Sequence, residues 1–68
     1  MLVKVSRAAG TRKSYAVEEG ATVNDALGKA GIILSDKEEV FVNGERASRE
    51  TLLHQNDKIT VSNMVKGN

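Results

Sequence analysis

The sequence contains no cysteine and no proline, and it has only two aromatic residues, one tyrosine and one phenylalanine. The lack of cysteine excludes disulfides, thiolate metal ligands and thiol nucleophiles from this chain. The lack of proline means that no slow prolyl isomerisation is expected during folding. No apolar run approaches the ~20 residues of a membrane span, and no charged-then-apolar leader opens the chain, so we expect a cytoplasmic protein without a membrane segment.

Sixty-eight residues with a net charge of +1 fit one small domain. A chain of this size buries roughly 60% of its unfolded surface, which allows a single modest core. The last periodic residues end near position 63, so we expect a single domain over residues 1–63 and a flexible tail over 64–68. We expect the domain to be a monomer.

The first half of the chain changes from a strand period to a helix period. Two alternating runs around Gly10-Thr11 predict an N-terminal hairpin. After Gly20, Thr22 with Asp25 three residues later predicts a helix N-cap, and Gly31 predicts a left-handed C-terminal cap. We interpret Gly28, inside this helix, as a small residue that allows close helix–sheet packing. The predicted apolar stripe of the helix consists of Val23, Ala26, Leu27 and Ala30.

The second half of the chain is organised by two turn signals. Asn43-Gly44 follows a short strand at 40–42, and Asn56-Asp57 precedes a last strand at 58–62. The residues between them are predicted to form an irregular polar crossing, in which Ser48 caps a single helical or 3₁₀ turn. Alternation points Val40 and Val42 inward and Phe41 outward.

These elements predict an α+β fold with one helix on a mixed four-stranded sheet. The helix covers the apolar face of the hairpin, and the later strands extend the same sheet, with the last strand beside the first. This is the β-grasp, or ubiquitin-like, arrangement. The predicted core consists of Val3, Val5, Tyr15, Val17, Val23, Leu27, Val40, Val42, Leu53, Ile59 and Val61.

The chain resembles the small β-grasp sulfur carriers of the ThiS and MoaD type, and through them ubiquitin and the TGS domain. The resemblance lies in the helix entry at 20–27, the turn at 40–44 and the stretch 53–61 with its acidic turn. It implies an adenylating, E1-like enzyme as partner and a C-terminal Gly-Gly whose carboxylate is activated. Here the last residues are Lys66, Gly67 and Asn68, and Gly67 alone matches. We therefore expect no sulfur carriage without C-terminal processing.

Two polar sites have simple structural interpretations. His54 is the only histidine, so neither a catalytic triad nor a multi-histidine metal site can be built, and we expect it on the surface. Asp57 is interpreted as a turn former whose carboxylate accepts nearby backbone N–H groups. The acidic residues at 36–50 match no calcium-loop spacing, and we expect no metal and no cofactor.

Phe41 is the most informative candidate for binding. Strand alternation places it on the open sheet face with Leu2, Lys4, Lys58 and Thr60, a composition typical of a modest protein-binding patch. The leading hypothesis is therefore a non-enzymatic, ubiquitin-like module that binds another protein through these residues and its tail. The alternatives are a sulfur carrier or protein modifier activated at its C-terminus, and a TGS-like RNA-contacting module. The basic hairpin favours RNA, but it offers no exposed aromatic platform for stacking, so nucleic-acid binding is not favoured.

Overall fold

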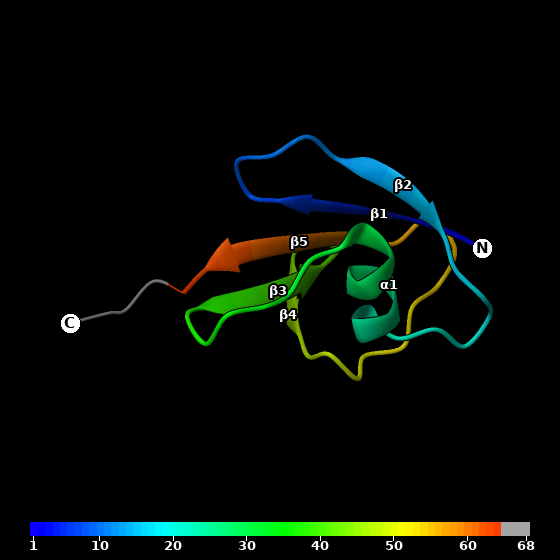
Figure 1. Cartoon of the computed structure of the whole chain (residues 1–68). Coiled ribbons are helices and arrows are strands. Elements are labelled where there is room, and N and C mark those ends of the chain that lie inside the picture. The colour runs from blue at the N-terminus through cyan, green and yellow to red at the C-terminus, as the bar shows by residue number, and fades with distance from the viewer. Residues whose placement is uncertain (65–68) are drawn as a thin grey trace.

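The computed structural model describes residues 1–64, which form one sheet and one helix (Figure 1). The elements in chain order are β1 (Leu2–Arg7), β2 (Lys13–Ala16), α1 (Val23–Ala30), β3 (Glu38–Val42), β4 (Glu45–Ala47) and β5 (Lys58–Asn63). The strands lie in the order β2-β1-β5-β3-β4. β1 and β5 pair in parallel, and the other neighbours pair antiparallel, so the sheet is mixed as predicted.

The strand count corrects the prediction, because the sheet has five strands and not four. Asn43 and Gly44 both have positive φ, at 53° and 86°, which is the backbone of a two-residue hairpin turn. The chain therefore reverses directly, and Glu45–Ala47 pairs with β3 instead of starting an irregular crossing. Three residues with a mostly polar pattern carry too little periodicity to be recognised as a strand.

The helix begins and ends where its caps were predicted. The Thr22 hydroxyl accepts from the Asp25 N–H, and the Asp25 carboxylate accepts from the Thr22 N–H. Gly31 adopts the left-handed conformation, with φ 71°, at the other end. The interpretation of Gly28 was wrong, since a Cβ added there would meet nothing within 4 Å. Gly28 therefore makes no close approach to the sheet, and it weakens the helix.

The core lies between α1 and one face of the sheet. Of the predicted core residues, nine are buried, while Tyr15 and Val42 lie partly exposed at its margin. Ala21 and Ala26 are also buried in this layer. The buried side chains are small, and the largest that are fully enclosed are Ile59, Val3, Val23 and Val61.

The crossing from β4 to β5 contains turns and no helical turn, which corrects the expectation for residues 48–55. Ser48 does not cap a helix. Its backbone N–H donates to the Thr51 hydroxyl, and its carbonyl accepts from the Thr51 N–H. Leu52 forms an isolated bridge with Thr22, while Leu53 next to it is buried. Pairing with the segment before α1 thus holds this stretch extended.

Candidate functional site

The open face of the sheet is the face that α1 does not cover. Strand register brings side chains of neighbouring strands together there: Lys4 of β1 lies opposite Lys58 of β5, and Phe41 of β3 lies opposite Thr60 of β5. These four predicted residues therefore form one contiguous patch. Leu2 lies on the same face, 49% exposed, but near the β1 start, away from Phe41.

Phe41 is more covered than the sequence suggested, because it is partly rather than fully exposed. It stands between two neighbours in register, Thr60 on β5 and Arg46 on β4. Arg46 owes this position to the β3–β4 hairpin, which was not predicted from the sequence. Strict alternation beyond Asn43-Gly44 is the signal that would have placed Arg46 on the same face as Phe41.

Two arginines border this patch in different ways. The Arg46 Nε lies 2.9 Å from the Glu39 Oε1, and its side chain remains 76% exposed. The Arg12 Nη2 donates to the Thr60 hydroxyl at 3.5 Å. Because Thr60 lies opposite Ser6, the Arg12 side chain crosses β1 at the level of Ser6, which is buried. The face therefore presents one aromatic ring within a predominantly cationic border.

Lys4 and Lys58 form the exposed, charged part of the patch. They are partners in register, and neither makes an ion pair within residues 1–64. Like charges at neighbouring strand positions repel each other by a few tenths of a kcal/mol or more, with the magnitude set by solvent screening. An anionic group placed above these two ammonium groups would remove that repulsion. The composition of the patch is therefore complementary to an apolar and acidic surface.

The acidic turn beside the patch is structural. The Asp57 carboxylate is largely buried and accepts from the Asn43 side-chain amide at 2.9 Å and from the His54 backbone N–H at 2.8 Å. This confirms Asp57 as a turn former. His54 is exposed as expected, with its Nδ1 3.8 Å from Asp57. Within the described residues, no group of three His, Asp or Glu side chains gathers as a metal site would require.

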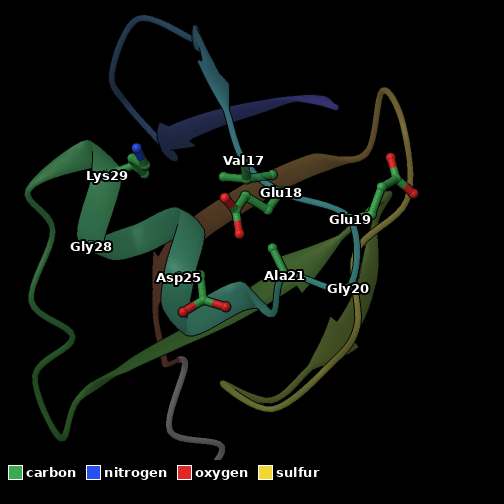
Figure 2. A pocket seen from close by; sticks show the side chains of 8 residues that line it. All are labelled: Val17, Glu18, Glu19, Gly20, Ala21, Asp25, Gly28 and Lys29. Atoms are coloured by element: carbon green, nitrogen blue, oxygen red, sulfur yellow. The ribbon is translucent and has the colours of Figure 1, made fainter.

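A concave surface also lies between the segment after β2 and α1, away from the open-face patch (Figure 2). Glu18, Asp25 and Lys29 line it, together with the small residues Ala21 and Gly28. Asp25 is already engaged in capping α1. Among the described residues this groove holds no group of acidic side chains that could bind a metal, and its lining does not define a chemistry.

The basic hairpin does not form a surface for stacking RNA bases. Arg7 of this hairpin is paired with Glu38, and Tyr15 lies at the core margin, so the hairpin has no aromatic platform for stacking bases.

The predicted tail residues Lys66, Gly67 and Asn68 lie outside the described residues. The preceding Met64 donates its backbone N–H to the Lys37 carbonyl at 2.7 Å. No helix within residues 1–64 is long and apolar enough to cross a bilayer.

One helix on a mixed sheet, with the first and last strands parallel at its centre, defines a ubiquitin-like β-grasp fold. The crystal structure of SAMP1 from Haloferax volcanii matches this arrangement over 100% of both chains, with a TM-score of 0.80 and 20% sequence identity. A structure of H. volcanii small archaeal modifier protein 1 matches over 94% of this chain and 98% of that one, at the same TM-score and identity. No family model and no curated protein matches the sequence. The likeness confirms the predicted fold.

Proposed function

We propose that this chain is a non-enzymatic, ubiquitin-like module that binds another protein through its open sheet face. The observation that carries this proposal is the position of Phe41, a partly exposed ring on an uncovered face, beside the cations Lys4 and Lys58. A ring of this kind is the usual anchor of a small interface, and charges around it select the partner. The contact would take place in the cytoplasm, and a monomer suffices for it.

A modifier or sulfur carrier is the second candidate function. It is supported by the resemblance to the ThiS and MoaD carriers and by the likeness in fold to a protein that is named a small archaeal modifier. In this case the partner is an adenylating, E1-like enzyme, and the C-terminal residues carry the chemistry. The intact mass of the protein from its native source separates the candidates. A carrier ends at a glycine and is found in part with sulfur in place of one terminal oxygen.

Site-specific photocrosslinking in the native cell tests the binding proposal. A photoreactive phenylalanine analogue replaces Phe41, and in a control it replaces Ile33, which is 88% exposed on the loop after α1. We expect a discrete crosslinked protein from position 41 and none from position 33. The purified partner should then bind Phe41→Ala at least about tenfold more weakly than the parent chain, a loss of ~1.4 kcal/mol. Equal affinity of Phe41→Ala and the parent would place the contact elsewhere.

A further inference from the structure

The outer edge of β2 carries backbone groups that the sheet does not use. β2 is the terminal strand of the sheet (Figure 1). Val17, just after it, exchanges backbone hydrogen bonds with Met1 at 2.7 and 2.8 Å. Bonded and non-bonded residues alternate along an antiparallel pair, so every second residue back from Val17 bonds to β1. Ser14 and Ala16, which lie between these, therefore direct their N–H and C=O groups away from the sheet.

Charge changes sign along this same edge. Arg12 and Lys13 stand at the beginning of the strand, and Glu18 and Glu19 follow its end, with no charge between them. All four residues are exposed, and none of them makes an ion pair within the part of the chain that the structure describes. Glu19 is directed away from α1 (Figure 2). The edge thus has a positive end and a negative end.

Two antiparallel copies of this edge complement each other in their free backbone groups and in their charges. With Ser14 of one copy opposite Ala16 of the other, the outward N–H and C=O groups meet in hydrogen-bonded pairs on both sides of a twofold axis. Tyr15 then stands opposite the Tyr15 of the second copy, at the close position where aromatic pairs gain most. In the same register, Arg12 lies at the level of Glu18 of the other copy, and its guanidinium would exchange its 3.5 Å contact with the Thr60 hydroxyl for that carboxylate.

We propose that β2 is a self-recognition edge, through which two copies of this chain pair antiparallel and join their sheets. A lysine on a sheet edge normally prevents pairing with another strand. Here Lys13 and Arg12 disfavour every incoming strand except one that carries carboxylates at their level. A second copy in the antiparallel orientation does carry them, whereas a parallel copy places cations beside cations.

The association is expected to be weak. β2 has only four residues, so the contact area falls well below the ~800 Å² per partner of a standard interface. The dimer should therefore form at high protein concentration, and salt should weaken it because the charged ends are exposed. In dilute solution the chain is a monomer. Of the four charged residues at this edge, Lys13, Glu18 and Glu19 lie outside the open-face patch, and only Arg12 borders it.

Sedimentation equilibrium of the full chain over a concentration series, at low and high salt, measures this association. Arg12→Glu with Lys13→Glu makes both ends of the edge negative, and Glu18→Lys with Glu19→Lys makes both ends positive. Each double variant alone should associate at least about tenfold more weakly than the parent. An equimolar mixture of the two should associate more tightly than either alone, because each end then faces the opposite charge. This rescue also shows that the variants are folded.

Two further variants separate the edge from general charge effects. Lys37→Glu with Arg49→Glu makes the same change in net charge as Arg12→Glu with Lys13→Glu, at positions away from β2, and it should leave association unchanged within about twofold. Ala16→Pro removes one outward N–H, which an edge strand tolerates, and it should weaken association. A parent chain that stays monomeric at every concentration overturns the proposal. So does a mixture of the charge-reversed variants that associates no better than its components.

Discussion

The side-chain amide of Asn43, at the β3–β4 turn, donates to the buried carboxylate of Asp57, just before β5, over 2.9 Å. The same Asn43 side chain accepts from the Lys58 backbone N–H at 3.0 Å, and its own backbone has a positive φ of 53°. Asn43 therefore forms part of a hairpin turn and also connects this turn to β5 through two side-chain hydrogen bonds. These two roles can be separated by mutation.

Asn43→Gly keeps the positive φ and removes both side-chain hydrogen bonds. We expect it to lower the free energy of unfolding by ~1–3 kcal/mol, because the buried Asp57 carboxylate loses a donor. Asn43→Ala should cost about 1 kcal/mol more, since alanine resists the left-handed backbone. Urea denaturation of both variants measures the difference. Equal stabilities would mean that the turn conformation contributes nothing.

Gly28→Ala is expected to stabilise the protein by ~0.5–1 kcal/mol. Gly28 lies inside α1, and an added Cβ meets nothing within 4 Å. Gly31→Ala is the matched control, and it should destabilise the protein because Gly31 has a φ of 71°. Thermal denaturation, monitored by circular dichroism, measures the change in melting temperature of both variants. A destabilised Gly28→Ala would show that the helix packs more closely on the sheet than these contacts allow.

Leu27→Ala should lower the free energy of unfolding by about 2–5 kcal/mol, because Leu27 is 3% exposed and is the largest side chain on the buried stripe of α1. Ile33→Ala, at a position that is 88% exposed, should change it by less than ~0.5 kcal/mol. Denaturant titration of both variants tests the assignment of the helix face. A small effect at Leu27 would contradict that assignment.

Glu38 makes the free energy of unfolding depend on pH. The Ser35 backbone N–H donates to its carboxylate, and with the nearby Arg7 guanidinium this holds the pKa of Glu38 below its ordinary value of 4.5, although partial desolvation opposes the shift. A carboxyl with a lowered folded-state pKa stabilises the protein above its unfolded value and loses this effect as pH falls through the folded value.

Glu38→Gln should therefore be less stable than the parent at pH 7, and the difference should shrink as pH falls below about 4.5. Glu45→Gln, on the edge strand β4, is the control with the same change of charge. Melting temperatures of the three proteins between pH 7 and pH 3 provide the measurement. A constant gap between Glu38→Gln and the parent would assign the effect to packing and not to ionisation.

Most of the fold could be predicted because its signals are local. Thr22, Asp25 and Gly31 define the helix ends through caps that involve residues only a few positions apart. Alternation placed Val3, Val5, Ile59 and Val61 on one face, and they are all buried. The strand Glu45–Ala47 escaped prediction because its pairing depends on the turn before it and not on its own pattern.

The candidate site could be predicted only in part. Alternation identified the face of Phe41, but the flanking position of Arg46 depends on β4, and the reach of Arg12 to Thr60 depends on the path of a loop. The extent to which Phe41 is covered likewise depends on neighbours from two other strands. Such distances between side chains of different strands depend on the strand register. Alternation in the sequence tells which face of the sheet a side chain lies on, but it does not tell which residue of the neighbouring strand lies opposite.

The parallel pairing of β1 with β5 gives the domain a mechanical property. The two strands run side by side, so a force that pulls Leu2 and Asn63 apart acts along the strands and loads their hydrogen bonds together in shear. Bonds in an antiparallel hairpin pulled at its open end would instead break one after another. A force applied between the two ends of the domain therefore meets its greatest resistance at the β1–β5 pair, in the centre of the sheet.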